Sequence, residues 1–272
     1  MTSTLDSTMP SPPVDAVAIV GHGRRDVHEA EERVRALAAA EGVRVVDDPA
    51  EAKLAVALGG DGTILRTLAR LLGSGVPVIG VNFGRVGFLA SVEPDRLEED
   101  LRRVFAGEYT VLEQPTLEAR LDGAEFVAVN DVVATSSTLG RMVELAWAVG
   151  GEDLGVVPCD GMICSTPSGS TAYNLSNGGP VLVRGLDAMA ITFIAPHSLH
   201  ARPLVVPRGA EVTVRNATPG VDAAVLIDGH RSGELPPDAR LAIRLGRERS
   251  LLATLPETSF FGRYRETFTS HP

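Results

Sequence analysis

The sequence predicts two domains: an α/β N-terminal domain with a Rossmann-like parallel sheet, and an all-β, sandwich-like C-terminal domain. Up to about residue 112, short apolar runs alternate with amphipathic helical periods, which is typical of a parallel sheet covered by helices on both faces. Beyond Glu113 the chain consists of short β-rich runs separated by Gly, Pro or Asp-Gly, which indicates antiparallel sheets. The change of rhythm at Glu113 is therefore the expected domain boundary.

The first part, residues 14–112, is expected to form the α/β domain, after a disordered tail over residues 1–13. Apolar runs predict strands over 14–20, 53–58 and 76–81. Helical periods predict helices over 26–41, 63–72 and 94–106. The first of these helices ends at Gly42 and places five apolar residues on one face: Val27, Ala30, Val34, Leu37 and Ala38.

The second part, residues 113–254, is expected to be a β-rich domain that binds the ligand. One helix is expected to interrupt it after Pro167. The segment 255–272 carries three phenylalanines and one tyrosine, too apolar for a free end, so it is expected to dock back on the α/β domain. Strands are predicted over 116–121, 125–133, 143–149, 190–194, 211–215, 223–227 and 240–245.

Composition excludes several functions. The chain has 272 residues, is 44% apolar and carries a formal net charge of −10, which argues against a nucleic-acid footprint. No apolar run is long enough to cross a membrane, and the first residues do not resemble a signal peptide. Two cysteines, Cys159 and Cys164, lie on a strand-like segment at a spacing that places them on opposite faces, so no disulfide is expected and a reduced, cytoplasmic setting follows.

The only lysine is Lys53, so no Walker loop exists and phosphate handling must depend on backbone amides, arginines or a metal. The segment Leu58-Gly59-Gly60-Asp61-Gly62-Thr63, between a strand and a helix, suits phosphate because helix-terminal amides face the turn. A carboxylate beside phosphate would repel it. Asp61 is therefore expected to act as a base toward a hydroxyl or to hold Mg²⁺, and the structural alternative is that it caps the helix.

Two further segments could contact the same ligand. The loop 81–89 follows the third strand, and ligands of open α/β sheets bind beyond the carboxyl ends of strands. Its Phe88 is interpreted either as core or as an apolar wall against an adenine. Asn130 and Asp131 end an apolar run in the β-rich half, where they could bind ribose hydroxyls or a carboxamide, or could make an ordinary turn.

The segment 160–180 is the longest candidate. It is rich in hydroxyl, amide and glycine residues, too polar for a core, and residues 168–171 could cap a helix with its amides facing a ligand. No G-x-S-x-G pattern supports a serine hydrolase. His197 and His200 lack further Cys or His partners for a zinc site, so no metal ligands are assigned, and His197 is interpreted as a polar wall residue.

Taken in order, these segments closely resemble the ATP-dependent NAD kinases, which share the G-G-D-G loop with phosphofructokinases and diacylglycerol kinases. The matching elements are G-G-D-G-T from Gly59, N-x-G-x-x-G-F-L from Asn82, N-D-V-V from Asn130 and A-P-H-S-L-x-x-R-P-L-V-V-P from Ala195. The most specific element is T-P-x-G-S-T-A-Y-x-L-S-x-G-G-P from Thr166. Asn174 and Asn177 stand where the family more often has Ser and Ala.

The resemblance implies phosphorylation of the 2′-hydroxyl of the adenosine ribose of NAD, with ATP and Mg²⁺, to give NADP. It implies that Asp61 is the catalytic acid-base residue and that NAD lies in the cleft. It also implies a homodimer or homotetramer in which Asp160 reaches NAD from a neighbouring subunit. The implied NAD-binding residues are Gly60, Gly62, Phe88, Asn130, Asp131, Asp160, Thr171, Ala172, Tyr173, Ser176, Ala195 and His197.

Two other functions are compatible with parts of the sequence. A lipid or sphingoid-base kinase would share the G-G-D-G loop but would need an apolar acceptor pocket, against which the polar segment 166–180 argues. A non-catalytic NAD-binding regulator would keep the Asn130 and Tyr173 regions and lose the acid of the glycine loop, yet Asp61 is present. Polyphosphate stays open beside ATP as the phosphate donor.

Overall fold

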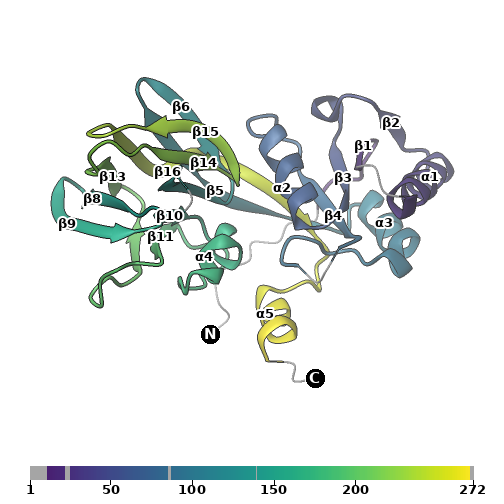
Figure 1. Cartoon of the computed structure of the whole chain (residues 1–272). Coiled ribbons are helices and arrows are strands. Elements are labelled where there is room, and N and C mark those ends of the chain that lie inside the picture. The colour runs from purple at the N-terminus through teal and green to yellow at the C-terminus, as the bar shows by residue number, and fades with distance from the viewer. Residues whose placement is uncertain (1–10, 22–24, 85–86, 139, 270–272) are drawn as a thin grey trace. The chain divides into compact units, whose positions relative to one another are not determined.

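The computed structural model describes residues 11–21, 25–84, 87–138 and 140–269 (Figure 1). The expected tail over residues 1–13 lies largely outside these ranges, as do His22, Gly23 and Arg24 after the first strand. The chain divides into two compact units: unit 1 comprises Met1–Glu113 and Ser250–Pro272, and unit 2 comprises Gln114–Arg249. The N-terminal unit is therefore built from both ends of the sequence.

Unit 1 contains the predicted parallel sheet. Its strands are β1 (Ala16–Gly21), β2 (Arg44–Val46), β3 (Leu54–Gly59), β4 (Val78–Asn82) and the end of β16 (Arg240–Thr254), in the order β2-β1-β3-β4-β16. Every pairing along this order is parallel, including the two-residue contact of β16 with β4. The α/β fold class is confirmed, and the short strand β2 is an addition to the prediction.

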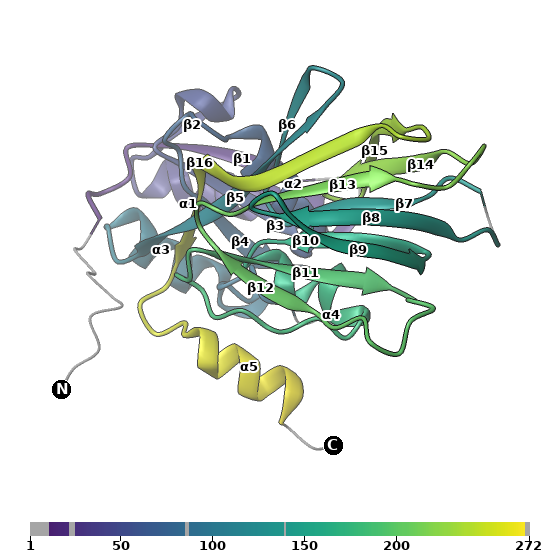
Figure 2. The same cartoon turned by 90° about the vertical axis from the view of Figure 1, so that its left-hand side faces the viewer.

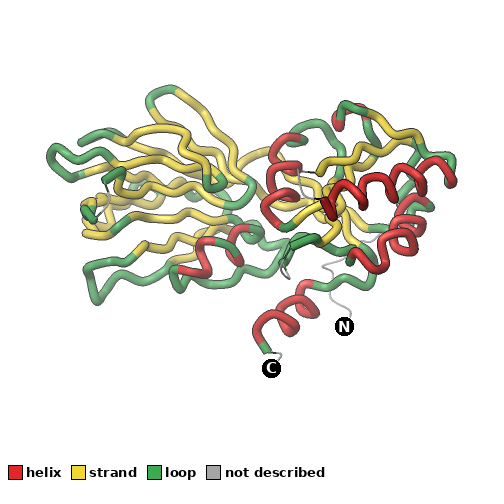
Figure 3. Tube along the Cα trace, turned by 45° about the vertical axis from the view of Figure 1, so that its right-hand side comes forward, coloured by secondary structure: helices red, strands yellow, loops and turns green. Residues whose placement is uncertain are grey.

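Helices cover this sheet: α1 (Arg25–Ala40), α2 (Asp61–Arg70) and α3 (Leu97–Phe105), with 3₁₀ turns η1 (Pro49–Glu51) and η2 (Pro94–Arg96), shown in Figure 3. The buried residues of α1 are the five predicted ones, and Gly42 after it has φ 71°. The predicted helix over 94–106 is divided, because its first turn is η2. In the described part of the chain, no helix is long and apolar enough to span a membrane.

The C-terminal helix α5 (Phe260–Phe268) also belongs to unit 1 (Figure 2). Ser259 caps it by accepting a hydrogen bond of 2.9 Å from the backbone amide of Gly262. None of its residues is fully buried, and the Phe261 side chain is 68% exposed. The helix is attached to unit 1 by aromatic and arginine contacts that bear directly on the glycine loop, as described below.

Unit 2 is a sandwich of two antiparallel sheets. One contains β12 (Leu204–Pro207), β11 (Ala188–Ile194), β10 (Gly161–Ser165), β7 (Asp131–Ser136), β14 (Ala223–Ile227) and β15 (His230–Leu235), in that order. The other contains β9 (Glu152–Cys159), β8 (Val143–Val149), β13 (Glu211–Asn216), β16, β5 (Thr110–Leu121) and β6 (Ala124–Ala128). The all-β prediction for this half is confirmed.

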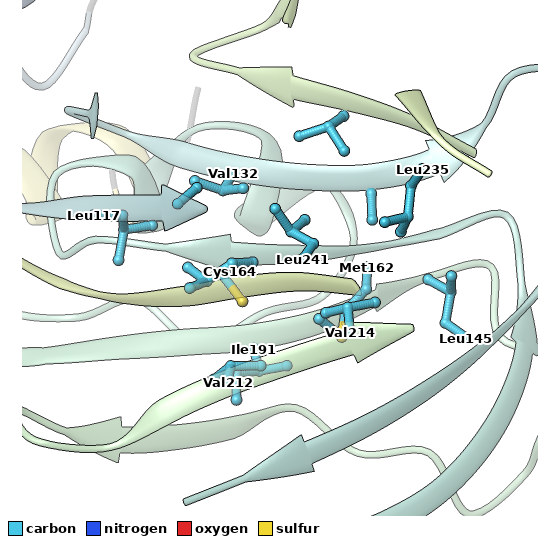
Figure 4. Close-up of a cluster of buried hydrophobic side chains, with 14 of the residues drawn as sticks. Leu117, Val132, Leu145, Met162, Cys164, Ile191, Val212, Val214, Leu235 and Leu241 are labelled. Carbon is cyan, nitrogen blue, oxygen red and sulfur yellow. The ribbon is translucent and has the colours of Figure 1, made fainter. Parts of the chain in front are cut away.

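The core of unit 2 lies between its two sheets. Figure 4 shows Leu145 and Val212 of one sheet with Met162 and Ile191 of the other, in one buried cluster. Burying such side chains is the main favourable contribution to folding, about 25 cal/mol per Å² of apolar surface. The core therefore fixes which residue of each strand faces inward, and hence which residues are left at the strand ends.

The helix expected after Pro167 is present and short: it is α4 (Tyr173–Ser176), preceded by the 3₁₀ turn η3 (Gly169–Thr171). Two predictions for this half are wrong in detail. The run 125–133 is two strands, β6 and β7, because the chain bends at Val129 and Asn130. The strand-like segment 159–164 turns at Asp160, so the two cysteines lie on β9 and β10. Both are free thiols, and burial raises the pKa of each to about 12.

Candidate active site

The glycine loop of unit 1 connects the buried strand β3 to α2. Gly60 is the N-cap residue of α2 and makes no side-chain capping bond, and Asp61 is the first residue of the helix. Acidic residues at this end of a helix are favoured by its dipole. The carboxylate of Asp61 does not cap α2, however, because it accepts its hydrogen bonds from a different segment.

Two backbone amides hold the Asp61 carboxylate. The amide of Phe88 donates to Oδ2 at 2.8 Å and the amide of Leu89 donates to Oδ1 at 3.2 Å. A Cβ atom at Gly87 would overlap the Asp61 carboxylate, so only glycine fits beside it. Each carboxylate oxygen has about two acceptor positions, so one on each stays available to a ligand. The acid is thus oriented while still able to accept a proton.

The C-terminal helix α5 packs against the segment that carries these two amides. The Phe88 ring is 8% exposed and lies 6.2 Å from the Phe260 ring and 5.8 Å from the Phe268 ring, centroid to centroid. Arg263 donates from Nη2 to the carbonyl of Ala90 at 2.9 Å. These contacts agree with the core interpretation of the Phe88 ring. Its backbone amide, not its ring, makes the contact with Asp61.

The loop after β4 packs on the glycine loop. The Asn82 side chain accepts from the Gly84 amide at 3.1 Å and donates to Glu93 at 3.4 Å. A Cβ atom at Gly84 would lie 3.0 Å from the Cα of Gly60, which shows how closely the two loops approach. Arg85 and Val86 of the same loop lie outside the described residues. The Asn82 side chain therefore stabilises the loop after β4.

In unit 2, Asn130 and Asp131 lie where β6 ends and β7 begins. Both side chains are buried, 8% and 5% exposed. The Oδ1 atom of Asn130 is buried without a hydrogen-bond partner among the described residues. Burial raises the pKa of Asp131 to about 7, with the neighbouring charge of Asp228 as a second, smaller cause.

Asp228 is a residue that the sequence does not single out. Its carboxylate accepts hydrogen bonds from the amides of Val129, Asn130 and Asp131, although it is about a hundred residues further along the chain. In the sequence it belongs to an Asp-Gly pair, which signals a hairpin turn. No local signal shows that this acid faces the bend at Asn130.

The first part of the polar segment, residues 166–170, is buried together with Asn174, contrary to the expectation that the segment is too polar for a core. The Thr166 hydroxyl donates to Val129 O at 2.7 Å, and the Ser170 hydroxyl donates to Pro167 O at 2.7 Å. The Asn174 side chain donates to Ser170 O and Pro180 O and accepts from Thr192. Most of these buried side chains bond to backbone carbonyls of the segment itself or of Val129, which is why so many polar groups can be buried.

The expected cap at residues 168–171 is also absent. Ser168 is the N-cap residue of η3, but its side chain makes no capping bond and its Oγ is buried without a partner among the described residues. The residues that resemble NAD contacts lie at the outer side of this segment: Ala172, Tyr173 and Ser176 are exposed, and Thr171 is partly exposed. The buried residues of the segment therefore form a scaffold, and the outward residues form a surface that a ligand can reach.

The remaining predicted site residues are exposed on loops of unit 2. Asp160 lies between β9 and β10, where its backbone carbonyl accepts from Ser136 and Thr135 and its side chain is exposed. Ala195 follows β11 with φ 42°, and the amide of His197 donates to Pro158 O at 2.8 Å. Their backbones are fixed while their side chains stay accessible.

The described ranges contain no group of three or more His, Cys, Asp or Glu residues that could hold a metal. A parallel sheet with an oriented acid on a glycine loop, at the N-terminus of a helix, fits an enzyme that transfers a phosphoryl group from a nucleotide. The class is that of the small-molecule kinases.

The family models for ATP-NAD kinase match both units. The N-terminal domain model covers residues 18–109 and the C-terminal domain model covers residues 129–255. The chain belongs to the ATP-NAD kinase family. The match excludes the lipid-kinase alternative, because no resemblance limited to the G-G-D-G loop would extend over both domains.

Curated relatives and solved structures support the same family assignment. The chain is 42% identical to an NAD kinase of Heliobacterium modesticaldum over 218 residues, 78% of this chain and 77% of that protein. It is 37% identical to an NAD kinase of Gemmatimonas aurantiaca, over 84% and 80% of the two chains. An NAD kinase from Archaeoglobus fulgidus, crystallised with ATP, matches with a TM-score of 0.77 and 27% identity over 93% of this chain and 97% of that one.

The yeast NADH kinase, crystallised with NADH, shares the fold. Its TM-score is 0.85 at 21% identity, and the match covers 96% of this chain and 89% of that one.

Proposed function

We propose that the chain transfers the γ-phosphoryl group of ATP to the 2′-hydroxyl of the adenosine ribose of NAD, and so produces NADP. NAD kinase activity follows from the family. The choice of residues is supported by one observation above all, the Asp61 carboxylate held by the amides of Phe88 and Leu89. An acid fixed in this way loses little freedom when it meets a hydroxyl group.

In the proposed reaction, Asp61 accepts the proton of the 2′-hydroxyl. The 2′-oxygen forms a bond to the γ-phosphorus, and the bond from that phosphorus to the β-phosphate oxygen breaks, which releases ADP. Phosphoryl transfer depends mainly on positioning and on neutralising charge. The fixed carboxylate of Asp61 positions the hydroxyl group, and the dipole at the N-terminus of α2 neutralises part of the phosphate charge.

Mg²⁺ is proposed to enter bound to ATP. The ATP phosphates would supply most of its oxygen ligands, a common arrangement for Mg²⁺. When bound, the ion neutralises phosphate charge.

The residues proposed to bind NAD include Gly60, Gly62 and Phe88. The buried pair Asn130 and Asp131 is proposed to make polar contacts with NAD. The outward residues Thr171, Ala172, Tyr173, Ser176, Ala195 and His197 complete the set. Exposure of most of this group, beside a scaffold that satisfies its own hydrogen bonds, supports the assignment.

Self-association is part of the proposal. The exposed Asp160 side chain is proposed to reach NAD bound to a neighbouring subunit, in a homodimer or homotetramer. Light scattering together with Asp160→Ala tests this point: the variant should keep the oligomer and lose NAD affinity. We propose the cytoplasm as the compartment, since the two cysteines are free thiols. No nucleic-acid partner is proposed, since the chain carries a net charge of −10.

The test of the function is direct. Pure protein is incubated with NAD, Mg²⁺ and either ATP or polyphosphate, and NADP is measured with an NADP-specific dehydrogenase. Diacylglycerol with radiolabelled ATP serves as the parallel acceptor. Asp61→Asn should lose orders of magnitude in kcat with little change in NAD binding. Near-normal turnover in this variant would remove Asp61 from the mechanism, and absence of NADP in wild type would reject the function.

A further inference from the structure

Two Asp-Gly turns in unit 2 invite comparison. Asp122–Gly123 joins β5 to β6 with φ values of 50° and 82°, and Asp228–Gly229 joins β14 to β15 with φ values of 49° and 79°. Tight hairpin turns require positive φ at both central residues, and Asp-Gly provides it readily. Turn geometry alone therefore accounts for an aspartate at each position.

The two aspartates differ in where their carboxylates are. Asp122 is exposed. Asp228 is partly buried, and its Oδ1 accepts from the amides of Asn130 at 2.7 Å and Asp131 at 3.1 Å, while its Oδ2 accepts from the amide of Val129 at 2.9 Å. The amide of Asp228 donates to Asp131 O at 3.0 Å. Hydrogen bonds to a carboxylate are stronger than those between neutral groups. The turn itself does not require the three amide bonds that the Asp228 carboxylate accepts.

The same bend is held from its other side by backbone and hydroxyl contacts. The amide of Thr166 donates to Asn130 O at 2.9 Å, and a Cβ at Gly169 would overlap the Asn130 carbonyl. The backbone of Asn130 is thus fully engaged, whereas its side-chain Oδ1 is buried and unpartnered among the described residues. This arrangement fixes the main chain and leaves the side chains to a ligand.

We propose that Asp228 is the positioning residue for the Asn130–Asp131 pair, holding that pair in the orientation that binds NAD. The inference depends on the proposed function, because it takes this pair as an NAD contact. Asp228 acts through the three amides and is not itself assigned a contact with substrate. Residues that bind a ligand are effective only when a second layer of contacts fixes their orientation.

Charge links Asp228 to Asp131 as well. Burial, and to a smaller extent the Asp228 charge, raises the pKa of Asp131 to about 7, and burial also raises the pKa of Asp228 against the opposing effect of its three amides. His230 on β15, whose Nδ1 lies 3.1 Å from Asp228 O, acts to lower the pKa of Asp228. The other neighbours of the bend, Ser165 on β10 and Gly169 in η3, are uncharged.

The experiment compares Asp228→Asn with Asp122→Asn. Asparagine tolerates the left-handed region, so both turns should form, and the amide that replaces the Asp228 carboxylate keeps one accepting oxygen but loses the charge. NAD KM and kcat are measured with Mg·ATP from about pH 5.5 to about pH 9, and NAD binding by calorimetry. Asp228→Asn should raise KM about tenfold or more, leave kcat within about threefold, and move the pH midpoint of NAD affinity downward. Asp122→Asn should match wild type.

An unchanged KM and an unchanged midpoint in Asp228→Asn would overturn the proposal, as would an equal effect of Asp122→Asn. If Asp228→Asn does not fold, Asp228→Glu is measured in the same way. It keeps the charge but displaces the carboxylate from the three amides, so the KM for NAD should still rise, and an unchanged KM rejects the role. Wild type that binds NAD but transfers no phosphate would reject the proposed function, while calorimetry would still test Asp228.

Discussion

The carboxylate of Asp61 accepts a hydrogen bond of 2.8 Å from the backbone amide of Phe88, a residue 27 positions further along the chain. This bond relates the first turn of α2 to a loop that follows another strand. Because the donor is a backbone amide, no substitution of the Phe88 side chain removes it directly. With Asp61 itself unchanged, the bond can be disturbed by moving the loop or by filling the space beside the carboxylate.

Gly87→Ala tests that space. The new Cβ would overlap the Asp61 carboxylate, so the acid must rotate or the loop must shift. We expect kcat to fall by about tenfold to a hundredfold, with NAD affinity changed far less, because the acid acts in the transition state. Steady-state kinetics with a thermal unfolding control measures this. A variant with normal kcat would show that the position of Asp61 is not critical.

Phe260→Ala and Phe261→Ala form a matched pair on α5. The Phe260 ring packs against Phe88, whereas the Phe261 side chain is 68% exposed. Phe260→Ala should lower the free energy of unfolding by roughly 1–3 kcal/mol, less than for a fully buried ring, and should also lower kcat. Phe261→Ala should change both little. Urea denaturation and kinetics compare the two, and equal effects would contradict the idea that α5 supports the Phe88 loop.

Asp131 predicts how stability depends on pH. Its pKa in the folded chain is about 7, raised from an ordinary value near 3.9, so the folded state binds the proton more tightly. Its contribution to stability is therefore complete below about pH 4 and is lost as pH rises to about 7. Asp131→Asn removes this loss.

The variant should consequently be more stable than wild type at about pH 8, by up to a few kcal/mol, and the difference should shrink toward about pH 5. Thermal unfolding at a series of pH values measures it. A constant difference between the two proteins across this range would show that Asp131 does not titrate there.

Asn174 and Asn177 test the scaffold of the polar segment. Asn174 is fully buried and makes three side-chain hydrogen bonds, so Asn174→Ala leaves buried groups of Ser170, Pro180 and Thr192 without partners. We expect a loss of about 2–4 kcal/mol in the free energy of unfolding. Asn177→Ala loses one exposed bond to Tyr173 O and should cost less than about 1 kcal/mol. Similar losses would contradict the scaffold role.

Local patterns predicted much of the fold. The apolar face of α1 and the bounds of β8 and β14 agree with the prediction, because each element packs one regular face against a core. Strand β9 has no such pattern, since its first five residues are exposed, and it was not predicted. The length of β16 was underestimated, because its last part pairs with a parallel strand near the other end of the chain.

The candidate site was predicted unevenly for the same reason. Asp61 was found because a lone acid among glycines at a strand-to-helix junction is unusual. The backbone amides of Phe88 and Leu89, which orient it, could not be predicted, because every residue except proline carries such an amide. Asp228 was missed because Asp-Gly already has a sufficient local explanation as a turn. The burial of residues 166–170 depends on side-chain hydrogen bonds to backbone carbonyls, one within the segment at Pro167 and one at the distant Val129, which composition does not reveal.

Strand β16 has a consequence for how the protein is made. Its residues Leu252 and Ala253 supply the parallel partner of Val78 and Ile79 on β4, and they lie near the end of the chain. A nascent chain leaves the ribosome N-terminus first, and its domains tend to fold as they emerge. Unit 2 is a single continuous segment and can fold as soon as it is synthesised. The sheet of unit 1 must wait with β4 as an open edge, so the first domain in the sequence is the last to be completed.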